Sequence, residues 1–136
     1  LLSNNAVNKK ITIINECAQN TMVTADEDML SSVFQNLLSN AIKFTNPGGK
    51  IVFTCLALEK EIKISVTDNG VGMREEDLSK LFRLDSNFTT YGTGDEKGSG
   101  LGLLLCHEMI ERNNGTIKAE SKLGNGTTFH FTLPKG

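Results

Sequence analysis

The chain has 136 residues, with 14 Lys or Arg against 16 Asp or Glu and a formal charge of −2. This length predicts one domain that can bury a core without metal or disulfide staples. The charge balance provides no basic surface for nucleic acid, and no apolar run approaches the roughly 20 residues of a membrane span. We therefore expect neither nucleic-acid binding nor direct membrane contact.

The first residues are polar and show no periodic pattern, and the chain starts without an initiator methionine or a signal peptide. We interpret residues 1–10 as the remainder of a linker from a preceding domain and residues 11–136 as the folded domain. The three cysteines, Cys17, Cys55 and Cys106, include no CxxC pair and stand among apolar or strand-like neighbours. We expect them to be reduced core or near-core residues of a cytoplasmic domain.

Short strands are predicted at residues 11–14 and 22–24. A helix follows, because apolar residues recur at helical spacing from Leu30 to Ile42, behind an acidic first turn with Thr24 or Asp26 as its cap. Pro47 and the glycines after it end this helix. Residues 50–58 and 61–68 then form a hairpin with one buried face.

Glycines become frequent after residue 68, and a short helix is predicted near residues 75–82. Residues 83–100 have no convincing period, and a loop of that length is usually either functional or disordered. Residues 101–113 form a helix with Leu104, Leu105, Met109 and Ile110 inward, and residues 116–121 and 127–133 form a last hairpin. This order predicts an α+β fold, a two-layer sandwich with about three helices on one face of a mixed or antiparallel sheet of about five strands.

A polar stripe accompanies the apolar face of the first predicted helix. Asn36, Asn40 and Lys43 line up beside that face, with Phe44 at its edge. Amide oxygens suit a hard cation, and an ammonium group suits phosphate charge. Polar residues beside a core face are also common without any site, so the stripe alone is weak evidence.

Glycines introduce the second long helix, at Gly98, Gly100 and Gly102. The free N–H groups of a helix start attract anions, so phosphate could bind there. The pattern is neither a Walker A loop nor the dinucleotide fingerprint, because Leu103 occupies the place of the third glycine. An ordinary glycine-rich loop before a helix is the alternative.

Asp68 closes a predicted strand and is followed by Gly70 and Gly72. A carboxylate there could accept a hydrogen bond from an exocyclic amine such as that of adenine. A simple Asp-Asn-Gly turn is the alternative. The later glycines at residues 124 and 126 are fully explained by a hairpin turn.

Four motifs occur in one order: Asn36-x-x-x-Asn40 with Lys43-Phe44, Asp68-x-Gly70-x-Gly72, Leu81-Phe82, and Gly98-x-Gly100-Leu101-Gly102-Leu103. Together they resemble the N, G1, F and G2 boxes of the catalytic, ATP-binding domain of bacterial sensor histidine kinases. That domain has the Bergerat fold, shared with gyrase, MutL and the heat-shock chaperone ATPases. The resemblance extends over about residues 11–134 and implies a long lid over the bound nucleotide.

The resemblance also implies the ligands, Mg²⁺ and ATP. Asn40 would coordinate Mg²⁺, Asn36 and Lys43 would lie on the phosphate side, and Phe44 would lie against the nucleotide. Asp68 would bind the adenine amine. The remaining site residues implied are Gly70 and Gly72 at the purine, Gly98, Gly100, Leu101 and Gly102 at the phosphates, and Thr127 or Thr128 below the adenine. From their position and charge, we also expect Arg83 and Lys97 to be lid cations near the γ-phosphate.

The activity implied is transfer of the γ-phosphoryl group to a histidine of a separate dimerisation domain, and onward to a response-regulator aspartate. In ATP-hydrolysing relatives the position of Asn36 holds a Glu that activates water, and an amide cannot accept that proton. We therefore expect slow hydrolysis. His107 and His130 both lack the context of the acceptor histidine. The isolated domain should be a monomer and its parent a homodimer, whether free or anchored to a membrane.

Two other functions remain open. One is a module of the same fold that binds nucleotide or a partner without transferring phosphate. The other is an anti-sigma-type serine kinase, although such kinases usually keep a Glu at the position of Asn36.

Overall fold

The structure of the chain, a computed structural model, describes residues 9–79 and 101–136, apart from the side chain of Leu101. Its elements are β1 (Thr12–Asn15), α2 (Glu27–Phe44), β2 (Lys50–Ala57), β3 (Glu61–Asp68), α3 (Glu75–Leu78), α4 (Leu101–Arg112), β4 (Ile117–Ser121) and β5 (Thr127–Pro134). The five strands form one sheet in the order β1-β2-β3-β5-β4. Only β1 and β2 are parallel, so the sheet is mixed.

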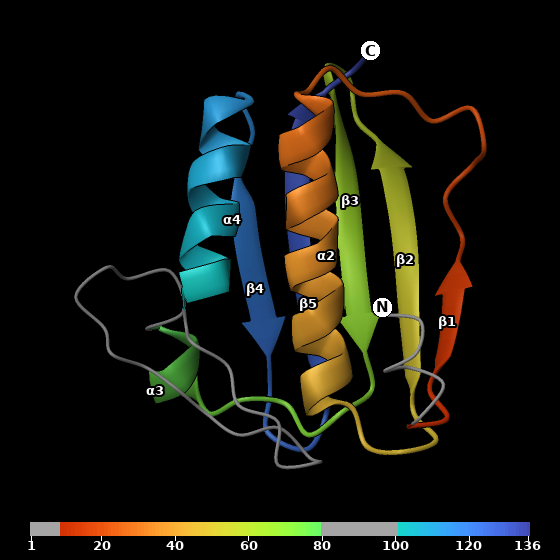
Figure 1. Cartoon of the computed structure of the whole chain (residues 1–136), viewed down its shortest axis with the longest axis vertical. Coiled ribbons are helices and arrows are strands. Elements are labelled where there is room, and N and C mark those ends of the chain that lie inside the picture. The colour runs from red at the N-terminus through yellow and green to blue at the C-terminus, as the bar shows by residue number, and fades with distance from the viewer. Residues whose placement is uncertain (1–8, 80–100) are drawn as a thin grey trace.

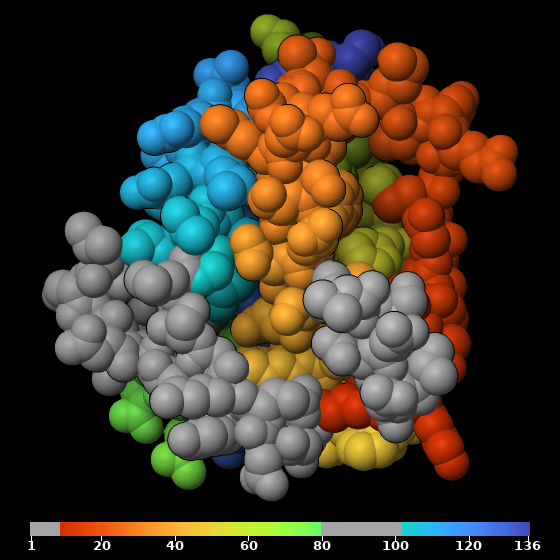
Figure 2. Space-filling model, in the orientation of Figure 1, coloured from red at the N-terminus to blue at the C-terminus, as the bar shows by residue number. Residues whose placement is uncertain are grey.

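Helices α2 and α4 lie side by side on one face of the sheet (Figure 1). In the space-filling view, the outer side of α2 runs down the middle of this face of the molecule (Figure 2). The predicted α+β sandwich is confirmed. None of the helices in the described ranges is both long and apolar enough to cross a membrane.

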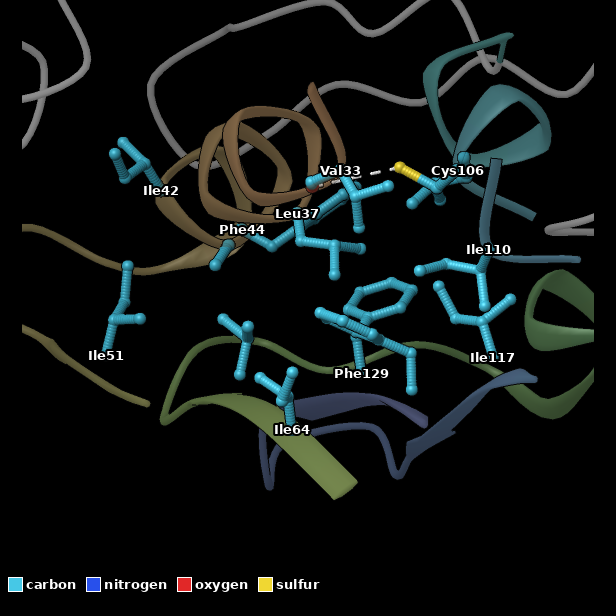
Figure 3. Packing of buried hydrophobic residues seen from close by; sticks show 14 of the residues in the cluster. Val33, Leu37, Ile42, Phe44, Ile51, Ile64, Cys106, Ile110, Ile117 and Phe129 are labelled. Atoms are coloured by element: carbon cyan, nitrogen blue, oxygen red, sulfur yellow. Dashed lines mark hydrogen bonds between the residues drawn. The ribbon is translucent and has the colours of Figure 1, made fainter. Parts of the chain in front are cut away.

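The core lies between the helices and the sheet. On the helix side of β3, Ile64 and Val66 pair with Phe131 and Phe129 of β5, and all four side chains are buried. From α2, Leu37 extends toward this layer (Figure 3), and it is fully buried. Alternation on β3 and β5 thus predicts correctly which side of the sheet carries the core.

The ends of α2 follow the predicted signals. Asp26 is the cap, because its Oδ1 accepts the Met29 N–H at 2.9 Å, and Glu27 and Asp28 occupy the positive end of the helix dipole. The strand predicted at residues 22–24 is wrong: Val23 forms only an isolated bridge with Lys135 near the chain end. A single bridged residue does not make a strand.

The inward face of α4 differs from the prediction, because Leu105 does not belong to it and Leu103 does. Leu105 is 47% exposed, whereas Leu103, Cys106 and Ile110 are buried. Positions 103, 106 and 110 share one face of a helix, and this is the face that packs toward α2 and the sheet. The thiol of Cys106 lies 3.9 Å from the Val33 carbonyl oxygen of α2 (Figure 3).

The expectation of three reduced cysteines is wrong for two of them. Cys17 and Cys55 form a disulfide that links the loop after β1 to β2. They come together because β1 and β2 are neighbouring parallel strands with Ile13 opposite Ile51, which places Cys17 level with Cys55. Cys106 is free, and burial raises the pKa of its thiol to about 11, against the opposing effect of a hydrogen bond with the Asn36 side chain.

Candidate functional site

The predicted site residues within the described part of the chain gather at one end of the sandwich. There β3 ends at Asp68, directly opposite Thr127 at the start of β5. The C-terminal end of α2 lies at the same end, which is the lower end in Figure 1, and the first residues of α4 lie beside the middle of α2, at Asn36. Four stretches far apart in sequence are thus brought near one another.

Asp68 is the most deeply placed acid of this region, with 4% of its surface exposed. Its Oδ1 accepts the Gly70 N–H at 2.9 Å, and the Thr127 N–H is a second backbone donor. Burial raises the pKa of Asp68 above its ordinary value, and these two hydrogen bonds partly offset that effect. Two carboxylate oxygens have about four acceptor positions, so Asp68 can accept a further hydrogen bond from a ligand.

The glycines after Asp68 allow close backbone contacts. A Cβ at Gly70 would overlap the carbonyl oxygen of Phe44, and that oxygen accepts the Val71 N–H at 3.0 Å. Gly72 has φ +72 and lies against the Lys122 carbonyl in the turn between β4 and β5. The segment after β3 is therefore held between the end of α2 and this turn.

The polar stripe of α2 is only partly solvated. Asn36 and Asn40 are half-buried, whereas Lys43 is buried with its Nζ 4.8 Å from the centroid of the Phe44 ring. A Cβ added at Gly102 would lie 3.2 Å from the Asn36 Oδ1, so the first turn of α4 lies directly beside Asn36. The helix start that was predicted to bind phosphate therefore adjoins the amide stripe that was predicted to bind metal.

Two residues of this region were not predicted from the sequence. The Ser121 hydroxyl accepts the Met73 N–H at 2.8 Å, donates to the Gly126 carbonyl at 2.9 Å and lies 2.8 Å from the Thr127 hydroxyl. Gly126, explained above by its turn alone, also lies against the Asp68 carbonyl, where a Cβ would overlap. These contacts depend on the strand register that places Ser121 opposite Thr127. No local sequence pattern specifies that register.

The two threonines proposed below the adenine lie on opposite faces of the sheet. Thr127 is buried beside Asp68, whereas the Thr128 hydroxyl donates to the Thr67 hydroxyl at 3.1 Å on the face without helices. Successive side chains of a strand point to opposite faces of the sheet. Only Thr127 therefore lies on the face that carries Asp68, and the prediction that Thr128 lies below the adenine is wrong. The other expected site residues, Arg83, Lys97, Gly98 and Gly100, lie outside the described residues, as do the Leu101 side chain and the Leu81-Phe82 motif.

Few side chains of the described residues could act as metal ligands at this end. Within residues 9–79 and 101–136, no three His, Cys, Asp or Glu side chains are grouped so that they could hold an ion. Of the predicted site residues, Asn40 offers an amide oxygen, which suits a hard cation whose coordination is completed by ligand oxygens and water. This donor set fits Mg²⁺ bound through phosphate better than it fits zinc or calcium.

Comparison with known proteins decides the family. The family described as "Histidine kinase-, DNA gyrase B-, and HSP90-like ATPase" matches residues 25–136. The chain belongs to this family. Among curated members, it is 38% identical over 112 residues to the sensor protein SrrB of Staphylococcus aureus, covering 82% of this chain and 19% of SrrB. It is 36% identical over 128 residues to the adaptive-response sensory kinase SasA of Rippkaea orientalis, covering 93% of this chain and 32% of SasA.

Solved structures of the family share the fold. The nucleotide-free catalytic domain of the histidine kinase ThkA superposes with a TM-score of 0.82 at 30% identity, over 98% of this chain and 86% of that one. ThkA in complex with the response regulator TrrA gives a TM-score of 0.76 at 29% identity, over 99% of this chain and 37% of that one. This chain thus corresponds to the catalytic domain of a histidine kinase, and it spans about a fifth to a third of the curated relatives.

Proposed function

We propose that this domain binds Mg²⁺ and ATP and supplies the γ-phosphoryl group to a histidine of a separate dimerisation domain, for relay to a response-regulator aspartate. The observation that carries the proposal is the buried carboxylate of Asp68, which has spare acceptor capacity and is followed by glycines that pack closely against the end of α2 and the turn between β4 and β5. A carboxylate so placed selects a ligand with an N–H donor, such as the adenine amine.

The proposed roles come from the family resemblance, and the positions of Asp68, Thr127 and Asn36 in the structure support them. Asp68 accepts the adenine amine, and Thr127 closes the base pocket beside it. Asn40 holds the metal, and Lys43 and Phe44 contact phosphate and nucleotide. Bound Mg²⁺ would neutralise phosphate charge, and phosphoryl transfer depends mainly on such positioning and charge neutralisation. Support for phosphate at the start of α4 comes from the contact of Gly102 with Asn36.

For the residues outside the described ranges, the proposal rests on sequence and family. Gly98, Gly100 and Leu101 would complete the phosphate-binding turn, and Arg83 and Lys97 would approach the γ-phosphate. The response regulator is proposed as a partner because the related ThkA forms a complex with TrrA. We further propose that residues 1–10 are a linker, that the isolated domain is a monomer working in the cytoplasm, and that its parent is a homodimer.

The proposed transfer reaction is tested with the purified chain, ATP labelled on the γ-phosphate, and the dimerisation domain of the parent protein. The label is expected on the acceptor histidine. Nucleotide binding with no label on that histidine would instead identify a binding module.

The identity of Asn36 predicts slow hydrolysis, because an amide cannot act as the base that activates water. The isolated chain should release inorganic phosphate from Mg-ATP very slowly. Rapid turnover that Asn36→Ala abolishes would contradict the proposed role. A phosphate-release assay at saturating ATP makes the measurement.

A further inference from the structure

Lys9, in the segment that leads into β1, contacts the end of α2. Its Nζ lies 2.9 Å from the Ile42 carbonyl oxygen, 3.3 Å from that of Lys43 and 3.2 Å from that of Thr45. Its own carbonyl accepts the Gly48 N–H at 2.8 Å. The residue is therefore joined to the last turn of α2 through its side chain and to the following turn through its backbone.

These contacts complete the hydrogen bonding of a helix end. The last carbonyls of a helix have no partner within it, and they carry the negative end of the helix dipole. The Ala41 carbonyl accepts the Thr45 hydroxyl at 2.6 Å, and the Phe44 carbonyl accepts the Val71 N–H. Lys9 adds a cationic donor to the carbonyls of Ile42, Lys43 and Thr45, the first of which also accepts the Thr45 N–H at 3.3 Å. A positive charge is the charge that this end of a helix favours.

The turn held by Lys9 is the turn that carries the nucleotide-binding side chains. Asn40, Lys43 and Phe44 all belong to the last part of α2, and the latter two are buried there. On one side this turn is fixed by Val71, which lies between Gly70 and Gly72; on the other it is fixed by Lys9. A change at Lys9 would therefore be transmitted to these side chains.

We propose that Lys9 is a positioning residue of the nucleotide site, which couples the segment leading into β1 to Asn40, Lys43 and Phe44. The inference rests on the proposed function, since it concerns the affinity of that site for Mg-ATP. It adds a route by which movement of this segment changes nucleotide affinity without any contact between Lys9 and the nucleotide.

The test compares Lys9→Met with two matched controls. Lys9→Met keeps an unbranched apolar stem and removes the ammonium group. Lys10→Met removes a neighbouring, exposed ammonium group. Ile117→Val removes a buried methylene of β4, a strand whose helix contacts are chiefly with α3 and α4, so that it costs stability without removing a contact of Lys9. Affinity for Mg-ATP is measured by calorimetry at a temperature where every variant is folded.

We expect Lys9→Met to weaken Mg-ATP binding about tenfold, the effect of losing a hydrogen bond to a charged group. Lys9→Arg should restore most of the affinity, because guanidinium can also donate to several carbonyls. Both controls should bind like the wild type. A wild-type affinity in Lys9→Met, or an equal loss in Ile117→Val, would overturn the inference while the proposed function stands.

A second measurement uses the unaltered chain and so does not depend on the folding of any variant. If the end of α2 and Lys9 are coupled to the site, saturating Mg-ATP should slow amide hydrogen exchange at Gly48 as well as at Val71. Unchanged exchange at Gly48 in the saturated protein would contradict the coupling. Failure of the wild type to bind Mg-ATP would remove both this inference and the proposed function.

Discussion

At the scale of single residues, Asp68 distinguishes this site from an ordinary turn. Its carboxylate is buried and receives two backbone N–H groups, so Asp68→Asn keeps the size of the side chain and removes the charge. We expect this variant to bind ATP about 10- to 100-fold more weakly, as for loss of a hydrogen bond to a charged acceptor. Its preference for ATP over GTP should also relax, because an amide presents a donor as well. Competition between the two nucleotides measures both effects, and equal wild-type affinities for ATP and GTP would contradict the assigned role.

The raised pKa of Asp68 gives opposite pH effects on binding and stability. Between the ordinary value of 3.8 and the raised pKa, the folded chain holds a proton that the unfolded chain has released, so the free energy of unfolding falls as pH rises. ATP binding requires the charged form, so affinity falls as pH decreases through the raised pKa. Asp68→Asn should lack both dependences. Calorimetry and urea unfolding as functions of pH check this, and identical pH profiles for the two proteins would count against it.

At the scale of elements, the segment after β3 fits the end of α2 only because Gly70 has no side chain. In Gly70→Ala the added Cβ would overlap the Phe44 carbonyl, so the hydrogen bond from Val71 must lengthen or break. We expect a loss of about 2 kcal/mol or more in the free energy of unfolding, together with weaker ATP binding.

Gly124→Ala is the matched control for Gly70→Ala. Gly124 has φ +86 but nothing within 4 Å of its added Cβ, so only backbone strain of about 1 kcal/mol is expected, with ATP affinity unchanged. Urea unfolding and calorimetry distinguish the two variants. Equal effects of both substitutions on ATP affinity would show that close packing at Gly70 has no special role.

Periodicity predicted the existence of the elements better than their detailed contacts. Alternation on β3 and β5 defined the core face, and the acidic start of α2 left Thr24 or Asp26 as its cap, of which the structure selects Asp26. On α4, a leucine-rich run made Leu105 and its neighbours equally suitable for burial, and only contact with α2 selects Leu103, Cys106 and Ile110. Ser121, Gly126 and Lys9 could not be predicted, because their partners are brought near only by strand pairing and helix packing.

At the scale of the whole molecule, the disulfide and the candidate site occupy different ends of β2. Cys55 is four residues from Ile51, which pairs with Asp68, a distance of about 13 Å along a strand. The bond closes a loop with a sequence separation of 38, so we expect reduction, or Cys55→Ser, to lower the free energy of unfolding by about 2–4 kcal/mol.

Affinity for ATP should be the same in the oxidised and reduced chains at a temperature where both are folded. Urea unfolding and calorimetry, each with and without reductant, provide the comparison. A reduced chain that unfolds at the same urea concentration would show that the link does not stabilise the fold. The reduced form matters for the proposed cytoplasmic location, since cytosolic proteins usually keep their thiols reduced.

The central claim is that the end of the sandwich formed by α2, β3, β5 and the start of α4 is a nucleotide site. Calorimetric titration of the chain with ATP, with and without Mg²⁺, tests it most directly, with Asp68→Asn as the matched variant. We predict saturable binding of one ATP per chain, strengthened by Mg²⁺ and weakened in Asp68→Asn. No heat at any ATP concentration, and no displacement of a fluorescent ATP analogue, would contradict the account.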